Sequence, residues 1–341
     1  MKKKHLFLAG AAVCAMACLL GGCTSRLKTS KDYAGTPASS SSDAAEGTSE
    51  ETEHAGAASA AETDAAVSST AEMTETTPAA EVTQTPDEVT SEEIAFDPSW
   101  EYAANSKINS GTAMLYHAKP SLANGHVICI NAGHGTKGGT EVTTLCHPDG
   151  TPKVTGGTTE EGATEAVAVS TGTEFLDGTP EAEITLKLAL VVKDKLLSAG
   201  YDVLMIRESG DVQLDNIART VIANQNADCH IALHYDSTDF DKGVYYMSVP
   251  SDERYRSMEP VASHYQEHNA LGDAVVGGIE SVGMKLFEGG AMEMDLTQTS
   301  YSTVPSIDLE VGDAASDYSE KSLNTIADGI LAGLNDYYKI A

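Results

Sequence analysis

The sequence predicts an α/β domain with a mostly parallel, twisted sheet and helices on both faces, preceded by a disordered N-terminal region. From Val127 onward, short apolar runs of strand type alternate with helical patterns of about ten or more residues, which is typical of strands joined by crossover helices. Residues 24–95, by contrast, are mainly Ser, Thr, Ala and Glu. A segment with so few large apolar side chains cannot bury enough surface to offset its chain entropy, so we expect it to be disordered.

The first strand and the first long helix are the clearest elements. Val127 to Ile130 form an apolar run that ends in Gly-His-Gly. After a long Gly- and Thr-rich loop at about 136–178, Thr179 is placed to cap a helix, Pro180 suits its first turn and Gly200 ends it. The remaining elements are expected in this order: a strand at 201–207, a helix at 214–226, strands at 229–237 and 243–249, a helix at about 269–282, an extended segment at 284–292, a strand at 304–312 and a helix at 319–338.

The first 22 residues look like a bacterial lipoprotein signal peptide. A positively charged start, Met1 to His5, precedes an apolar run from Leu6 to Leu20, which is shorter than the roughly 20 apolar residues that a membrane span needs. The run leads into Leu-Gly-Gly-Cys, which resembles the lipobox, where the peptide is cut before a cysteine that is then acylated. This resemblance implies an exported protein that a lipid on Cys23 anchors to the outside of the cell membrane. An ordinary signal peptide with a chance cysteine is the alternative.

The charge balance argues against a nucleic-acid partner. The chain has 51 acidic and 21 basic residues, a net charge of -30, whereas a nucleic-acid-binding protein normally presents a basic face. Acidic residues also outnumber basic ones in residues 23–95, which we interpret as a tether that like-charge repulsion keeps extended. The chain then divides into a signal peptide (1–22), this tether (23–95) and a folded domain (96–341).

The cysteines outside residues 1–23 predict no disulfide with confidence. Cys129 and Cys229 sit in apolar runs of strand type, where a buried free thiol is the usual state, and Cys146 falls in a loop. Three cysteines without paired spacing also make no zinc knuckle.

Chemically useful side chains stand where three predicted strands end. Ligands of open α/β sheets bind beyond the carboxyl ends of the strands, and these ends carry His134, His234 and Glu310. Glu181 opens the first long helix, which returns to the sheet after the long loop. Two histidines and a carboxylate are a common catalytic zinc set that leaves one position open, and a further carboxylate can then act as proton acceptor. The pattern is compatible with one zinc site at this edge.

Each of these residues also has an alternative interpretation. A histidine at a strand end is often a hydrogen-bonded loop residue, and Glu181 suits the positive end of a helix dipole without any ligand. Glu183 rivals Glu181, but it lies about 200° further round the helix, so both cannot face one metal. His230 lies on the same predicted strand as His234 and points to the same face, so it is the alternative ligand. Asp308 alternates onto the face of Glu310, where a buried acid is costly without a partner.

Four stretches of the chain, taken together, resemble the zinc-dependent N-acetylmuramoyl-L-alanine amidases of the type 3 family. They follow the family's order across about residues 125–338 and read VICINAGHG, TPEAEITLKLALVVKDKLLSAGYDVLMIRES, IARTVIANQNADCHIALHYDS and VPSIDLEVG. The resemblance implies that the domain at 96–341 hydrolyses the amide between N-acetylmuramic acid and L-alanine in peptidoglycan, for wall remodelling or autolysis. The acidic tether would let such an enzyme reach the cell wall from the membrane.

The resemblance also implies a role for each site residue. His134, Glu181 and His234 match the family's zinc ligands, and they would hold one Zn²⁺. Glu310, in the family's Glu-x-Gly strand end, matches the catalytic acid/base. Glu183 is then an acid that favours the helix N-terminus rather than a ligand.

Other positions match the family or depart from it. Arg207 and the helix around Arg219 match the family. Asn131 stands where the family often has Asp, at a position that could orient His134. The third ligand is followed by Tyr235–Asp236 instead of Ala-Asn. The loop at 136–178 is longer than in the shortest members, and it is a lid, a substrate-selecting wall or, as we favour, a mobile insertion. Autoinhibition by this loop is a further hypothesis.

Two other functions stay open at this point. A zinc peptidase that cuts within the stem peptide of peptidoglycan would use the same metal and base. A non-catalytic lipoprotein that binds wall fragments would need neither, and the presence of all four chemical positions counts against it.

Overall fold

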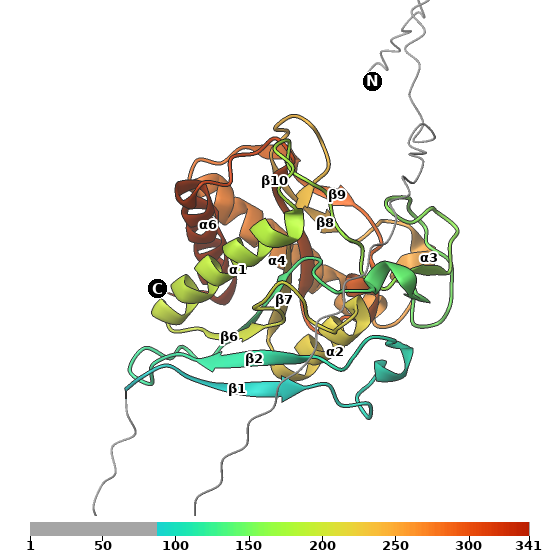
Figure 1. The fold of residues 1–341 in the computed structure, drawn as a ribbon, viewed down its shortest axis with the longest axis horizontal. Coiled ribbons are helices and arrows are strands. Elements are labelled where there is room, and N and C mark those ends of the chain that lie inside the picture. The colour runs from blue at the N-terminus through green and yellow to red at the C-terminus, as the bar shows by residue number, and fades with distance from the viewer. Residues whose placement is uncertain (1–86, 341) are drawn as a thin grey trace, which may run out of the picture. The chain divides into compact units, whose positions relative to one another are not determined.

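An eight-stranded sheet runs through the part of the chain that the structure describes, residues 87–340 of this computed structural model (Figure 1). The strand order is β1-β2-β6-β3-β7-β10-β8-β9. Its strands are β1 (Thr90–Ala95), β2 (Thr112–His117), β3 (Val127–Ala132), β6 (Asp202–Met205), β7 (Cys229–Asp236), β8 (Val244–Ser248), β9 (Leu286–Glu293) and β10 (Ser306–Asp313). The expected signal peptide, Cys23 and residues 23–86 of the expected tether lie outside the described residues.

The four central strands are parallel to one another. β6 pairs with β3, β3 with β7, and β7 with β10, while β2 and β8 flank this group in antiparallel pairing. Strands that are covered on both faces need apolar side chains on both sides, which explains the apolar runs of β3 and β6 in the sequence. The predicted α/β fold with a mostly parallel sheet is confirmed.

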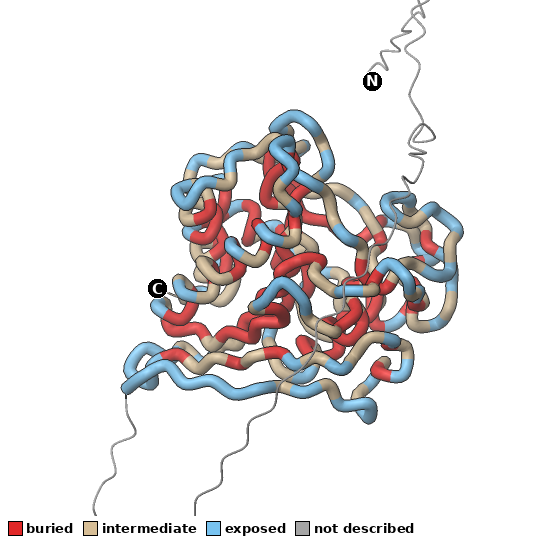
Figure 2. Tube along the Cα trace, viewed as in Figure 1, coloured by how far each residue is buried: buried red, intermediate tan, exposed pale blue. Residues whose placement is uncertain are grey.

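Helices cover both faces of this sheet, and the buried residues of Figure 2 lie between them. Three long helices share one apolar core with the central strands, and a fourth packs over β3 and β7 on the opposite face. Among the described residues, no helix is both long enough and apolar enough to span a bilayer. The helices are α1 (Glu181–Ser198), α4 (Val261–Ser281) and α6 (Glu320–Tyr338) on the first face, α2 (Asn216–Asn226) on the second, and the short α3 (Glu253–Arg256) and α5 (Thr297–Tyr301).

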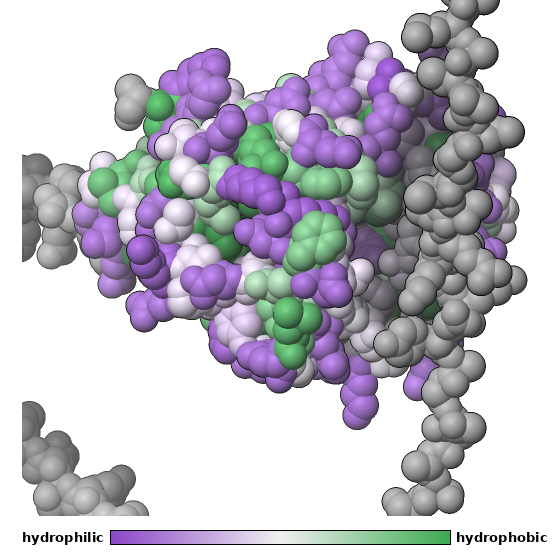
Figure 3. All heavy atoms as spheres, turned by 90° about the horizontal axis from the view of Figure 1, so that it is seen from above, coloured by the Kyte–Doolittle hydropathy of each residue, from purple (hydrophilic) through white to green (hydrophobic). Residues whose placement is uncertain are grey.

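On the face shown in Figure 3, hydrophilic residues surround smaller groups of hydrophobic ones. Large apolar side chains that are exposed are few: Val89, Leu122, Leu176 and Phe240.

Three boundaries differ from the sequence expectations. The first strand begins at Thr90, within the segment assigned to the tether, because β1 is an edge strand whose side chains are mostly exposed and polar. α4 begins at Val261 rather than near Asn269, because its first turns carry mostly polar side chains and lack a regular apolar pattern. The first helix takes Pro180 as its N-cap, since the Thr179 hydroxyl bonds to the Tyr318 hydroxyl instead of capping.

The expected loop at 136–178 contains secondary structure. Strands β4 (Thr143–Leu145) and β5 (Glu165–Val167) form a separate antiparallel pair after a short 3-10 turn. Cys146 and Phe175 of this segment are buried, and Phe175 packs into the main core. The segment, which we call the insertion, is therefore attached to the domain by its own buried side chains.

Glycines allow α4 and α6 to pack backbone against backbone. A Cβ on Gly278 would overlap the main chain of Gly329 and Gly333 on α6. A Cβ on Gly329 would in turn lie 2.6 Å from the Cα of Ile279. Glycine within a helix costs about 1 kcal/mol relative to alanine, so the close packing must offset that cost here.

Gly278→Ala should therefore destabilise the domain, because a methyl group at a backbone contact forces the helices apart. We expect a loss of about 1–3 kcal/mol in the free energy of unfolding, measured by urea denaturation. Gly277→Ala is the matched control, since a Cβ at Gly277 meets nothing within 4 Å and should stabilise by up to about 1 kcal/mol. Equal effects of the two substitutions would contradict this packing.

Candidate metal centre

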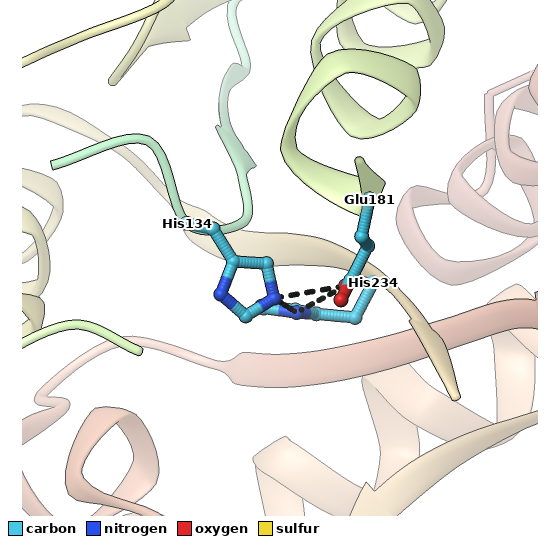
Figure 4. Close-up of side chains that lie close together, drawn as sticks. All are labelled: His134, Glu181 and His234. Carbon is cyan, nitrogen blue, oxygen red and sulfur yellow. Dashed lines mark hydrogen bonds and ion pairs between the residues drawn. The ribbon is translucent and has the colours of Figure 1, made fainter. Parts of the chain in front are cut away.

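His134, Glu181 and His234 converge from three separate elements (Figure 4). Glu181 Oε1 lies 2.9 Å from His134 Nε2 and 3.1 Å from His234 Nδ1. The two histidine nitrogens are 3.0 Å apart. The structure thus brings the three predicted ligands together in one cluster.

The turn after β3 presents His134. The residue has a φ of 64°, and Gly135 follows with a φ of 70°, so the chain reverses sharply in the left-handed region. Gly133 is needed for a second reason, because a Cβ there would overlap the ring of His234. The Gly-His-Gly sequence therefore serves both the turn and the close approach of the two rings.

Two buried arginines hold this turn in place. Arg207 Nη2 donates to the carbonyl oxygens of Gly133 and Ala182, each at 2.9 Å, and so ties the turn to the first turn of α1. Arg219 Nη2 donates to the carbonyl oxygen of His134 at 2.7 Å, and its Nη1 donates to Asn131 Oδ1 at 3.0 Å. Burial lowers the pKa of Arg219 to about 9, which still leaves it charged near neutral pH. Asn131 thus contacts Arg219.

Glu181 is the first residue of α1 and is almost fully buried. Its Oε2 accepts from the backbone N–H of Thr173 at 2.8 Å, and its Oε1 accepts from the backbone N–H of Tyr235 at 3.0 Å. Burial would raise the pKa of Glu181, but the two histidines outweigh that effect and hold the pKa well below its usual range. The carboxylate is therefore ionised and fixed in direction.

The hydrogen bonds of His134 leave its Nε2 facing the cluster. Its Nδ1 lies 2.9 Å from the carbonyl oxygen of Ser170, which can only accept, so Nδ1 carries the proton. Burial lowers the pKa of His234, but Asp308 and Glu181 outweigh burial and raise it to about 10. The surroundings of the His234 ring therefore favour a positive charge.

Glu310 lies next to this cluster, on β10, opposite His234 in the parallel register with β7. Its Oε2 is buried without a hydrogen-bond partner among the described residues. Burial and then the neighbouring Asp308 raise the pKa of Glu310 well above its usual value. The carboxyl group is thus placed in the cleft beside the three candidate ligands.

The alternative ligands lie elsewhere. Glu183 is 55% exposed and pairs with Lys187 on the outer surface of α1. His230 is fully buried outside the cluster, and neither ring nitrogen has a hydrogen-bond partner in the described part of the chain. Burial lowers its pKa to about 3, so it is neutral.

A cleft of about 620 Å³ surrounds the cluster. The insertion forms one side of it through Ser170 to Thr173 and Lys153, while Met247, Met292 and Met294 line another part. The residues Tyr235–Asp236, which depart from the family pattern, also line it. The insertion is therefore part of the cleft wall in this structure.

A buried carboxylate on the domain, Asp295, accepts hydrogen bonds from the insertion, and the sequence pattern did not predict this contact. Asp295, just after β9, accepts from Lys153 Nζ at 2.9 Å, from the backbone N–H of Val154 at 2.7 Å and from the Thr155 hydroxyl. His147 Nε2 lies 3.2 Å from its Oδ2. These partners are some 140 residues away in the chain, so no local pattern marks the contact. We call this group the Asp295 clamp.

The residues present fit a divalent cation. Two imidazole nitrogens and one carboxylate oxygen point at a common centre, and separations of about 3 Å match ligands that bind zinc at about 2.0–2.2 Å. A Cβ on Gly172 would lie 2.7 Å from both Glu181 Oε2 and His134 Cδ2, so a glycine leaves these side chains room to converge. An α/β sheet with this donor set and an adjacent carboxyl group defines a candidate metal-dependent hydrolase.

Comparison with known proteins supports this class. The sequence profile described as N-acetylmuramoyl-L-alanine amidase matches residues 128–335, and the chain belongs to this family. Membership makes it a hydrolase of the peptidoglycan amidase class. No protein of curated function matches the chain by sequence.

The chain is also similar to solved structures of amidases, one of which, the first below, reaches a TM-score of 0.50. An N-acetylmuramyl-L-alanine amidase, Ami1, from Mycobacterium smegmatis has a TM-score of 0.50 at 17% identity, with 64% of this chain and 99% of that chain covered. The apo Ami1 of Mycobacterium abscessus has a TM-score of 0.49 at 17% identity, covering 63% and 99%. The amidase from Clostridium difficile 630 has 0.45 at 16%, covering 64% and 99%. At these identities the likeness concerns the fold alone.

Asp295→Asn should destabilise the domain strongly at neutral pH, because it leaves the buried Lys153 ammonium without its counter-charge. We expect a loss of about 3 kcal/mol in the free energy of unfolding at pH 7. Hydrogen bonds from His147 and Lys153 outweigh burial and hold the pKa of Asp295 well below its usual value. Its contribution is therefore full above the unfolded-state pKa of about 3.9 and is lost as the pH falls below it.

Urea denaturation between pH 7 and pH 3 checks this. The difference in the free energy of unfolding between wild type and Asp295→Asn should become smaller as the pH falls toward 3. A difference that stays constant or grows would contradict the expectation that Asp295 stabilises the domain only when it is ionised. Asp336→Asn is the control, since Asp336 and Lys339 form an exposed pair that should contribute little at any pH.

Proposed function

We propose that this chain is a zinc-dependent N-acetylmuramoyl-L-alanine amidase that cuts the amide between N-acetylmuramic acid and L-alanine in peptidoglycan. The observation that carries the proposal is the convergence of His134, Glu181 and His234 beside Glu310 in one cleft. Family membership supports the choice of bond. In this proposal the three clustered residues would hold Zn²⁺ at the cleft.

A zinc ion bound there supplies Lewis-acid chemistry, which polarises a carbonyl and makes water more acidic. Glu310 accepts a proton from the attacking water and returns it to the alanine nitrogen as the amide breaks. A carboxyl group whose pKa burial raises is suited to both transfers near neutral pH. Glu181, held by Thr173 and Tyr235, keeps its charge toward the two histidines throughout.

The direct test separates metal binding from catalysis. The full chain should bind one Zn²⁺ and release new L-alanine amino termini from purified peptidoglycan, with muramic acid left on the glycan. Glu310→Gln should keep the metal and lose at least about 100-fold in kcat, because only the proton transfer is removed. His134→Ala should lose both metal and activity.

Product analysis decides between the candidate functions. A cut inside the stem peptide would identify a peptidase and overturn the choice of bond. A chain that binds no Zn²⁺ and releases no product would overturn the enzyme proposal and favour a wall-binding protein.

We also propose that the chain is exported and anchored to the cell membrane by a lipid on Cys23, facing the cell wall. The lipobox-like sequence before Cys23 supports this, and the acidic residues that follow would serve as a tether. The substrate of a peptidoglycan amidase lies outside the cell membrane, which is compatible with such a location.

Cys23→Ser should abolish the anchor. In cells fed labelled palmitate, the wild-type chain should carry the label and sediment with membranes, whereas the variant should be unlabelled. A wild-type chain without label would rule out lipid attachment, even if the enzyme proposal holds. Cys146→Ser is the control, since Cys146 is a buried thiol of the folded domain and should not change labelling.

A further inference from the structure

Asp308 is a largely buried carboxylate in the cleft with no role assigned so far. It lies on β10 two residues before Glu310, so both side chains face the same side of the sheet. Its side chain is 17% exposed, and its Oδ1 has no hydrogen-bond partner among the described residues. A buried acid without such a partner is costly, which calls for a function that offsets the cost.

The two histidines of the cluster use different ring nitrogens. His134 faces the cluster with Nε2, and its Nδ1 is held by the carbonyl oxygen of Ser170 at 2.9 Å. His234 faces the cluster with Nδ1, so its Nε2 points away from Glu181. This Nε2 lies 3.7 Å from Asp308 Oδ2. Each ring therefore has a polar neighbour on the nitrogen that does not face the cluster.

We propose that Asp308 positions His234 by accepting a hydrogen bond from its Nε2–H, which leaves the Nδ1 lone pair for the metal. This inference rests on the proposed zinc site. Histidines that bind metals commonly donate their other N–H to a carboxylate or a carbonyl oxygen, which fixes the tautomer and the ring direction. Ser170 does this for His134, and Asp308 does it for His234. The present distance closes to a hydrogen bond with a shift of roughly 0.5–1 Å.

Geometry separates this role from those of the neighbouring acids. The nitrogens of an imidazole ring point in divergent directions, so a group at Nε2 of His234 lies away from the donor atoms at Nδ1. Glu310 occupies the register position beside His234 but has no recorded polar contact with its ring. Asp308 is therefore a positioning residue rather than a fourth ligand.

The experiment measures Zn²⁺ affinity of the full chain by competition with a chelator, together with the visible absorption spectrum of the Co²⁺-substituted protein. Asp308→Leu should weaken Zn²⁺ binding by about 10- to 100-fold and alter the Co²⁺ spectrum, because the ring loses its acceptor. Asp308→Asn should retain most of the affinity, because its amide oxygen can still accept from Nε2–H. Asp308→Ala replaces the leucine variant if that variant has no cooperative thermal transition.

Glu310→Gln is the matched control, since it replaces the carboxyl group two residues further along β10, on the same strand face, with an amide of the same shape. It should leave Zn²⁺ affinity within about threefold of wild type. Equal weakening by Asp308→Leu and Glu310→Gln would overturn the inference in favour of a general charge effect, as would equal weakening by Asp308→Asn. Unchanged affinity in Asp308→Leu would overturn the inference and leave the zinc site standing. A wild-type chain without Zn²⁺ would overturn both.

Discussion

The site depends on two buried guanidinium groups that hold one turn of the backbone. Arg207 and Arg219 bond the carbonyl oxygens of the Gly133–His134 turn, and Arg207 also bonds the first turn of α1. A buried charge is tolerated only where it is well hydrogen-bonded. The carbonyl oxygens of the turn therefore stabilise the buried arginines, and the arginines in turn hold the backbone of the turn in place. Because His134 and Glu181 stand on the two segments that Arg207 joins, their approach is set before any ligand binds.

Three carboxyl groups, those of Glu181, Asp308 and Glu310, lie close to this framework. Glu181 is held ionised by the histidines, while burial raises the pKa of Asp308 and of Glu310, and the neighbouring Asp308 raises that of Glu310 further. A bound cation would stabilise these acids, and it would lie beside Glu310, the proposed proton carrier. The insertion contributes to the same arrangement, because Ser170 and the backbone of Thr173 orient two of the proposed ligands.

The sequence was informative where chemistry coincides with a local pattern. His134, His234 and Glu310 stand on predicted strands or directly after them, and the helix start at Glu181 follows from its propensities, so the central sheet and the grouping of these residues could be predicted. The Asp295 clamp could not, because its partners are far away in the chain and form no period. For the same reason the insertion was expected to be mobile, although its buried residues attach it to the core. The edge strand β1 was missed because its side chains are polar and mostly exposed.

The most direct test of the central claim is zinc-edge anomalous diffraction from crystals of the full chain grown with stoichiometric Zn²⁺. The account predicts a single strong peak about 2.0–2.2 Å from His134 Nε2, Glu181 Oε1 and His234 Nδ1, with Glu310 close by but not bonded to the metal. A peak at another group of side chains, or none in the cleft, would contradict it.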